Sequence, residues 1–463
     1  MVTWRMKVAR VVETFGPRLL SAAAGPRVTA HTQVFDAGNR FVAAATEDSR
    51  GPATLWLARV ACLWTVASTC LAAQPGNAQD ILDKAEDNLS LKSRNGWFRS
   101  DLSVLLDLEG YYVDQRAPGL LYANESFINP RATLFVDTKL GEQFYSLVQA
   151  RLDRGFDAAD EPFDARMDEY LLRWTPAGDG RLNLQFGKFA TVVGGWVQRH
   201  DTWQNPLITA PLPYENLTTV SSIEVPSSPS AFLARRNRAN DKDSYLPIIW
   251  GPAYTTGWEL FGTFGKADYA IEIKNSVNSS HPSEWTVGDT WWDYPTVSGR
   301  FGVRPAVGWN SGFSFSVGPY LYYDAEEDLP AGKTLSDYNQ VTLGYDLSYE
   351  WGHWQLWSEV FASRYEVPNA GNADTLAYYV EAKYKITTSL YAAARWNQQF
   401  FGKVPDGTGS EEAWDNDMLR IDLALGYRFS RHLQTKLQYS FGHRDGGPQQ
   451  GEQLVAVQVT LKF

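Results

Sequence analysis

The last thirteen residues, GEQLVAVQVTLKF from Gly451 to Phe463, constrain the fold of this chain more than any other stretch. Apolar and polar side chains alternate along them, which is the period of a β-strand with one apolar and one polar face. The printed chain stops on an aromatic residue directly behind the apolar stripe. Because termini usually fray, this ending predicts a strand that is paired within a sheet. A closed barrel in a membrane provides such pairing, since its last strand pairs with its first and its apolar face contacts lipid.

The same alternation recurs in sixteen segments, which are separated by stretches rich in Gly, Pro, Asn and Asp. Near the C-terminus, for example, Leu419, Ile421 and Leu423 alternate with Arg420 and Asp422. The sequence therefore predicts an all-β fold, a transmembrane antiparallel β-barrel of about sixteen strands with a range of about 14–18. The predicted strands are residues 97–113, 127–138, 143–154, 166–175, 181–189, 253–264, 267–275, 297–308, 311–323, 337–350, 353–364, 376–386, 388–399, 417–429, 432–442 and 453–463.

The connections between these segments alternate in length. Short turns such as Gly265-Lys266 and Trp351-Gly352 follow one strand, and longer connections follow the next. This pattern is typical of outer-membrane barrels, in which short turns face the periplasm and long loops face outward. The expected long connections are residues 155–165, 276–296, 324–336, 365–375, 400–416 and 443–452.

Composition supports a membrane barrel and excludes some partners. Aromatic residues reach 14%, yet the mean hydropathy is −0.33, which is too polar for a helical membrane protein. In a barrel, half of each strand faces water and aromatic girdles mark the two interfaces. The alternative that fits this composition is a secreted all-β carbohydrate-binding protein, whose apolar faces would be buried. The net charge of −11 argues against nucleic acid as a partner, because phosphate contacts need a basic surface.

The N-terminal part of the chain does not follow the strand pattern. Residues 55–78 combine positive charge, an apolar stretch and small residues, which is the layout of a secretory signal peptide. Since such a signal should begin near the start of a chain, residues 1–54 are interpreted as an unstructured upstream extension from a mis-assigned start. Residues 79–96 are expected to be a short periplasmic segment that can be helical, and residues 97–463 the barrel. The only two cysteines, Cys62 and Cys70, lie in the predicted signal.

Residues 190–252 form a long stretch without a clear period, and so long a connection within a compact domain is usually functional. We expect it to fold into the barrel and narrow a pore. Arginine and tryptophan side chains there offer hydrogen bonds and stacking to polar or anionic solutes. The alternative is an ordinary exposed loop. The constriction candidates are Arg199, His200, Asp201, Trp203, Arg235, Arg236 and Arg238.

Strand parity also predicts which charges face the interior. A charge that faces lipid at the bilayer midplane costs about 2–4 kcal/mol. The charged face of each strand must therefore face water in the barrel interior. Barrels of about sixteen strands leave an aqueous channel. The basic candidates for the lumen wall are Arg131, Arg151, Arg173, Arg395, Arg420 and Lys436. Rings of basic side chains favour anions, so a weak anion preference is expected.

Enzyme chemistry is not indicated. His200 and Asp201 lie near Ser221 and Ser222 in sequence, but a catalytic triad is defined by geometry and no nucleophile-elbow motif is present. Phosphate-loop, dinucleotide, zinc-protease and EF-hand motifs are also absent from the sequence, so no cofactor or metal is expected.

From about Trp97 to Phe463 the chain resembles a bacterial outer-membrane porin. The ending at Phe463 is similar to the C-terminal signal of such proteins, and LQFGKF at 184–189 is similar to the strand before the long loop of phosphate-selective porins. The resemblance implies an anion-passing channel in a Gram-negative outer membrane and homotrimers. Its implied partners are lipid, lipopolysaccharide and the barrel-assembly machinery, which would read Phe463. A second family to weigh is the monomeric polysaccharide-export barrel of about eighteen strands.

Overall fold

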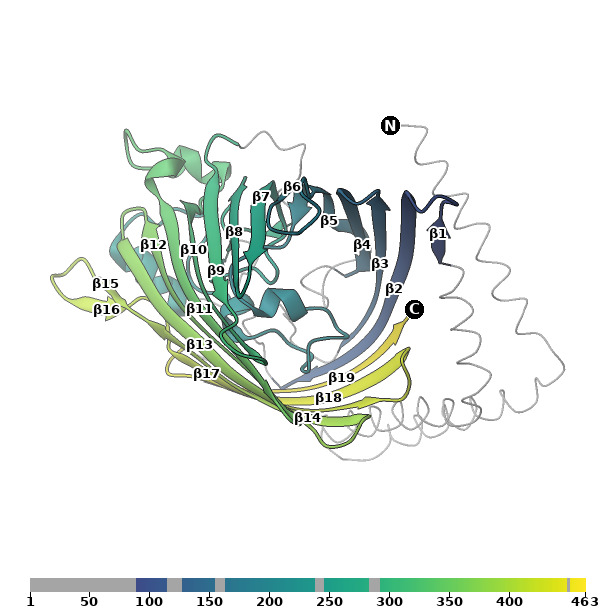
Figure 1. The fold of residues 1–463 in the computed structure, drawn as a ribbon. Coiled ribbons are helices and arrows are strands. Elements are labelled where there is room, and N and C mark those ends of the chain that lie inside the picture. The colour runs from purple at the N-terminus through teal and green to yellow at the C-terminus, as the bar shows by residue number, and fades with distance from the viewer. Residues whose placement is uncertain (1–88, 115–126, 155–162, 238–244, 283–291, 448–449) are drawn as a thin grey trace, which may run out of the picture. The chain divides into compact units, whose positions relative to one another are not determined.

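Sixteen antiparallel strands form one closed sheet in a computed structural model of the chain (Figure 1). The structure describes residues 89–114, 127–154, 163–237, 245–282, 292–447 and 450–463, all within one compact unit, residues 75–463. Strands that follow one another around the ring pair in chain order, and β19 pairs back to β2 to close it. The strands of the barrel are β2 Phe98–Val113, β3 Phe127–Leu140, β4 Phe144–Asp153, β5 Asp164–Trp174, β6 Asn183–Phe189, β7 Thr255–Phe264, β8 Ala267–Lys274, β9 Thr296–Val303, β10 Trp309–Pro319, β11 Asn339–Trp351, β12 Trp354–Val367, β13 Gly371–Lys385, β14 Leu390–Phe401, β17 Met418–Arg428, β18 Leu433–Arg444 and β19 Gly451–Lys462.

The predicted all-β barrel is therefore confirmed, and each of the sixteen predicted segments overlaps one of these strands. The sheet is a single ring, which rules out the two packed sheets of a soluble sandwich, and the count differs from the eighteen strands of export barrels. Two connections differ from expectation. Residues 365–375 are not a long loop, because β12 and β13 stay paired as far as Val367 and Gly371. The connection 400–416 contains a separate hairpin, β15 Lys403–Pro405 and β16 Glu411–Ala413.

Side chains on the two faces of the sheet meet different surroundings. On β17, Leu423 points outward and is 49% exposed, whereas the neighbouring Asp422 points inward and is fully buried. Across the barrel, Phe313 on β10 is 50% exposed, while Ser314 beside it is buried. The outward face is thus an apolar band and the inward face carries the charges, as in a barrel that crosses a bilayer. Among the described residues, no helix is long and apolar enough to span a membrane.

The C-terminal strand closes the barrel. Phe463 exchanges two backbone hydrogen bonds with Val104 of β2, at 2.7 and 3.1 Å. Beyond Phe463, the edge of β2 is taken up by β1, Ser90–Lys92, which pairs with Arg99–Asp101. A helix over residues 79–96 is therefore wrong for the part that is described, because this segment completes the ladder that the last strand leaves open. The predicted segments 1–54 and 55–78 lie outside the described residues.

The connection between β6 and β7 lies inside the ring of strands, as the teal segment in Figure 1 shows. It contains the short helices η1 Trp196–Arg199, η2 Leu212–Tyr214, α5 Pro229–Ala234 and η3 Arg235–Asn237. We call residues 190–252 the inner loop. Its first part, through η2, crosses the lumen, and its last part reaches the long-loop end of the barrel. The alternative of an exposed loop does not hold, because its side chains from Thr191 to Val220 are mostly buried.

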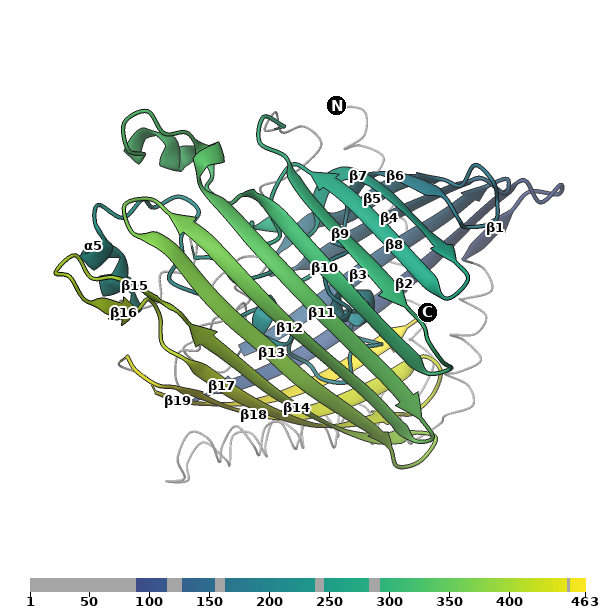
Figure 2. The same ribbon diagram turned by 60° about the vertical axis from the view of Figure 1, so that its left-hand side comes forward.

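The long-loop end of the barrel has its own apolar core, which we call the cap cluster. Trp414 is fully buried there, and its ring lies 5.9 Å from that of Phe232 of α5 and 4.8 Å from that of Phe401. Both views place α5 next to the β15–β16 hairpin (Figure 2). Two more short helices, η5 Tyr323–Asp328 and η6 Leu335–Asp337, contribute Ala325 and Leu335 to the cluster. Loops at this end therefore pack together.

Candidate functional site

Three glutamates on the barrel wall hold the start of the inner loop. Glu169 of β5 accepts a hydrogen bond from the Ala190 N–H at 3.0 Å. Glu272 of β8 accepts the Thr191 hydroxyl at 2.6 Å and the Val192 N–H at 3.3 Å. Glu359 of β12 accepts hydrogen bonds from the N–H groups of Gly195 and Trp196, which follow in the loop. Because these strands lie on different sides of the lumen, the loop is fixed as it turns inward.

Glu359 has four donors around its carboxylate. The N–H groups of Gly195 and Trp196 donate to it at 3.0 and 2.5 Å, and the hydroxyls of Tyr214 and Tyr379 also donate. The turn that presents these N–H groups passes through Gly194, which has a φ of +85°. A Cβ at that position would lie 2.0 Å from the Tyr214 hydroxyl, so only glycine fits.

A chain of alternating charges fastens the middle of the inner loop to the wall. Arg199 of the loop bonds Glu381 of β13 at 2.6 Å. Arg395 of β14 bridges Glu381 at 3.3 Å and Asp422 of β17 at 2.9 Å, and it also donates to Thr209 and Ala210 of the loop. Arg420 then joins Asp422 to Glu215 of the loop. Buried charges need such partners, because desolvation is costly and one missing partner leaves a charge unpaired.

Burial and these partners shift the protonation of loop residues. Burial alone would lower the pKa of Arg199, but Glu381 and Tyr379 outweigh it and raise the pKa above its ordinary value, so the guanidinium stays charged. Burial lowers the pKa of His200, against the opposing effect of its hydrogen bond to Val197. The neutral imidazole is therefore the favoured form inside the barrel at neutral pH.

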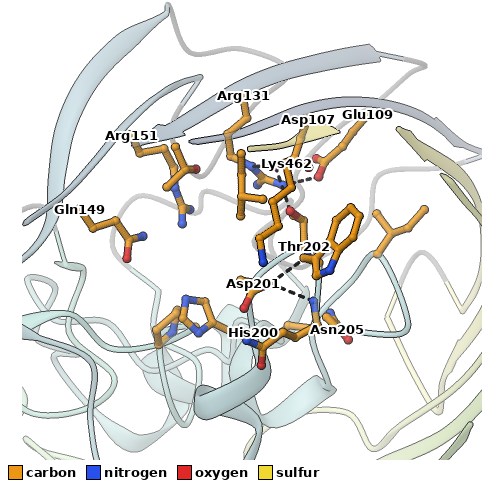
Figure 3. A pocket seen from close by; sticks show the side chains of 18 of the residues that line it. Asp107, Glu109, Arg131, Gln149, Arg151, His200, Asp201, Thr202, Asn205 and Lys462 are labelled. Atoms are coloured by element: carbon orange, nitrogen blue, oxygen red, sulfur yellow. Dashed lines mark hydrogen bonds and ion pairs between the residues drawn. The ribbon is translucent and has the colours of Figure 1, made fainter. Parts of the chain in front are cut away.

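A cavity of about 520 Å³ lies between the inner loop and the wall formed by β2 to β5, and we call it the β2–β5 cavity (Figure 3). Figure 3 shows Arg131, Arg151 and Lys462 pointing into it from the wall, opposite His200 and Asp201 of the loop. Six carboxylates line it, and each has a donor. They are Asp107 and Glu109 with Arg131, Asp137 with Tyr145, Glu169 with Ala190, Asp201 with Trp203, and Glu215 with Arg420.

A second cavity of about 460 Å³ lies on the other side of the loop, near the short turns, and we call it the short-turn cavity. Its wall residues come from β10 to β13 and β17, and they include Trp357, Lys383 and Arg428. Trp203 and Gln204 of the loop line both cavities. This part of the inner loop therefore separates two polar spaces within the lumen.

Four of the seven constriction candidates line these cavities: Arg199, His200, Asp201 and Trp203. His200 is held by Val197 O and by the Tyr254 hydroxyl, both at 2.5 Å from its ring nitrogens. Both ring nitrogens of His200 are thus taken by partners other than Ser221, whose hydroxyl oxygen accepts the N–H of Glu224. No group of three or more metal-binding side chains occurs in the described part of the chain.

The grouping of Arg235 and Arg236 with the constriction is a correction that the structure requires. Arg235 is buried under the cap cluster, where it donates to the carbonyls of Thr219 and Glu224. Arg236 donates to Ala413 O and pairs with Glu412 on the β16 hairpin. Both side chains stabilise packed loops at the long-loop end and line neither cavity, because α5 carries them away from the lumen. Arg238 lies outside the described residues.

The wall candidates all sit on the inward face, but their surroundings differ. Arg131 and Arg151 line the β2–β5 cavity and pair with neighbouring acids. Arg173 donates to Gln185 and lies over aromatic rings of the wall. Lys436 is buried against the loop and donates to the carbonyl of Thr202 at 2.5 Å. Arg395 and Arg420 belong to the loop anchor described above.

Sequence reasoning missed the residues that anchor the loop. Glu169, Glu272 and Glu359 lie at inward positions of their strands, but strand parity gives no sign that they accept backbone N–H groups of the loop. Two features of the sequence could have indicated these contacts. One is the set of acids at inward strand positions, and the other is the Gly194-Gly195 pair in a loop whose backbone N–H groups need acceptors.

Comparison with known proteins identifies the fold. No protein-family model matches the chain, and no curated protein matches it. The outer membrane channel DcaP of Acinetobacter baumannii is similar, with a TM-score of 0.51 at 12% identity over 81% of this chain and 99% of that one. OmpF of Salmonella typhi in complex with daunomycin has a TM-score of 0.51 at 12% identity, over 81% of this chain and all of that one. The chain thus has the fold of the outer-membrane porins.

Proposed function

We propose that this protein is a porin of a Gram-negative outer membrane, a water-filled channel for the passive diffusion of small polar solutes or ions. The observation that carries the proposal is the β2–β5 cavity. It is a space of about 520 Å³, lined by many charged side chains, inside a closed barrel whose exterior is apolar. Barrels of this size hold water where side chains do not fill them. The role is transport and not catalysis.

A weak anion preference is part of the proposal. The carboxylates that line the β2–β5 cavity are engaged by arginines, hydroxyls or N–H groups, which reduces the field they project. Lys383, Arg428 and Lys462, by contrast, form no ion pair among the described residues, and they contact aromatic rings instead. Unpaired cations along a route attract anions.

Assembly as a homotrimer in lipid and lipopolysaccharide is also proposed. Strands β6, β8 and β9 contain 7, 8 and 8 residues, fewer than the roughly 9–11 that a membrane-crossing strand needs. A second copy of the chain beside these short strands would cover the backbone polar groups near their ends, which lipid cannot hydrogen-bond. The barrel-assembly machinery would engage the last strand at Phe463. Sedimentation of the detergent-folded protein as a monomer would contradict the trimer.

Liposome swelling tests the channel. Vesicles that contain the folded protein should swell in an isotonic monosaccharide and more slowly in a trisaccharide, because the space beside the inner loop is small. Vesicles with the same amount of unfolded protein are the control. Equal and negligible swelling in both sugars, from protein shown to be folded by its gel mobility, would overturn the proposal.

A further inference from the structure

The short-turn end of the barrel carries a basic arc that spans β13 to β19. Lys383 and Lys385 lie at the end of β13, Arg428 at the end of β17, Lys436 on β18 and Lys462 on β19, and β14 lies between β13 and β17. No Asp or Glu occurs in residues 382–404, 423–440 or 454–463, which form these strand ends. Within these segments, no acidic residue offsets the positive charge of the arc.

Lys383 and Arg428 are the two members of this arc that line the short-turn cavity. Lys383 makes no ion pair with a carboxylate among the described residues and lies 4.4 Å from the centre of the Tyr391 ring. Arg428 is exposed, lies 4.7 Å from the centre of the Trp203 ring and donates one long hydrogen bond, 3.3 Å, to Gln434. Most of their donors remain available to a solute.

The acids that line the same cavity have partners already. Asp346 is held by Arg300 at 2.7 Å, and Glu359 is surrounded by its four donors. Glu350 accepts the Gln355 amide at 2.8 Å. These carboxylates come from β11 and β12, and Lys383 lies on the next strand, β13, where it pairs in register with Gln355. The cavity is thus lined by acids that already accept hydrogen bonds and by two cations, Lys383 and Arg428, that make no ion pair within the described part of the chain.

We propose that Lys383 and Arg428 form a binding site for a small organic carboxylate in the short-turn cavity, where solutes pause on their way through the channel. The site rests on the proposed channel function and names the class of its solute. A guanidinium fork matches the two oxygens of a carboxylate, and an ammonium adds a point charge. A volume of about 460 Å³ is within the range of small-molecule sites.

The remaining lining favours an organic body over a bare inorganic anion. Trp203 and Trp357 supply aromatic surface, and Gln198, Gln204 and Gln355 supply amide groups. Flat or unsaturated carbon skeletons pack on indole rings, whereas chloride gains nothing from them. A small aromatic carboxylate such as benzoate therefore combines both kinds of contact and is the suitable probe.

Calorimetric titration of benzoate into the detergent-folded full-length protein tests the site. The wild type should bind benzoate, and Lys383→Gln and Arg428→Gln should each weaken binding by roughly tenfold or more, since each removes a charged hydrogen-bond donor. The affinity of Arg428→Lys for benzoate should lie between that of these variants and that of the wild type. Lysine keeps the positive charge but lacks the two parallel donors of the guanidinium. Lys333→Gln, which changes an exposed lysine beyond the lumen, is the matched control and should bind as the wild type does.

The outcomes separate this site from the channel itself. Absence of benzoate binding, or equal binding by all variants, in a protein that still conducts potassium chloride would overturn the site and leave the channel standing. Competition by chloride at the same concentration as benzoate would overturn the assignment to carboxylates. Benzoate binding by a folded protein that never conducts would instead contradict the channel.

Discussion

Replacement of Arg395 by methionine is expected to release the inner loop from the barrel wall and raise the single-channel conductance. Arg395 is fully buried and bridges Glu381 to Asp422, and it also holds the carbonyls of Thr209 and Ala210. Breaking a buried ion pair costs about 3–5 kcal/mol, because charges are left behind without their partner. The strands retain their ladders of backbone hydrogen bonds, so the loss falls on the loop.

Conductance of single channels in planar bilayers measures this effect, and maleimide labelling of a cysteine introduced at Thr209 reports the loop directly. Arg173→Met is the matched control, because the contacts of Arg173 within the described residues are to the wall, to Gln185 and the rings of Tyr145 and Phe261. The Arg395 variant should conduct more and label faster, and the control should behave as the wild type. Unchanged labelling and conductance in Arg395→Met would show that the charged chain does not hold the loop.

The second large effect is expected from a charge on the outer face. Leu423 lies at the middle of β17 and is 49% exposed on the side opposite Asp422. If that side faces the hydrocarbon core, Leu423→Arg should destabilise the folded barrel by about 2–4 kcal/mol. Urea titration of the protein folded into lipid vesicles measures the change in the free energy of unfolding.

Tyr427→Arg provides the control for depth. Tyr427 is on the same strand and the same face, but it lies next to the short turn, where a charge near the interface costs only about 0–1 kcal/mol. A barrel in a bilayer predicts the larger loss at Leu423 and the smaller one at Tyr427. Equal, small losses at both positions would mean that this face meets water.

Much of the fold could be predicted from the sequence, because one local rule decides it. A strand in a barrel must alternate between lipid and water at every position, so Leu423 and Asp422 reveal their faces without any knowledge of their neighbours. Turn residues then mark the ends of strands. The pairing of Gly451–Lys462 with β2 followed in turn from the need to close the ring.

The parts that were missed depend on contacts between distant segments. Ser90–Lys92 contains too few residues to show a period, and it forms a strand because the edge of β2 is open beyond Phe463. Val367 and Gly371 stay paired through a stretch whose composition indicates a loop. The β-strand propensities of single residues do not predict pairing that depends on contacts with distant segments.

The same limit applies to the candidate site. Composition alone grouped Arg235 and Arg236 with Arg199, because all three are basic residues of one long stretch. In the structure, Phe232 of α5 packs against Trp414. Arg235 and Arg236, which follow α5, therefore lie outside the lumen, whereas Arg199 lies within it. Conversely, Lys383 and Arg428 are 45 positions apart in sequence and meet at one cavity only because β14 lies between their strands.

Electrical recording from the folded, full-length protein in a planar lipid bilayer tests the central claim most directly. A polar space beside the inner loop within an apolar-coated barrel predicts discrete, stepwise increases in current as single proteins insert, in potassium chloride and without any added ligand. Protein that is shown to be folded and inserted, and that nevertheless passes no current, would contradict the account.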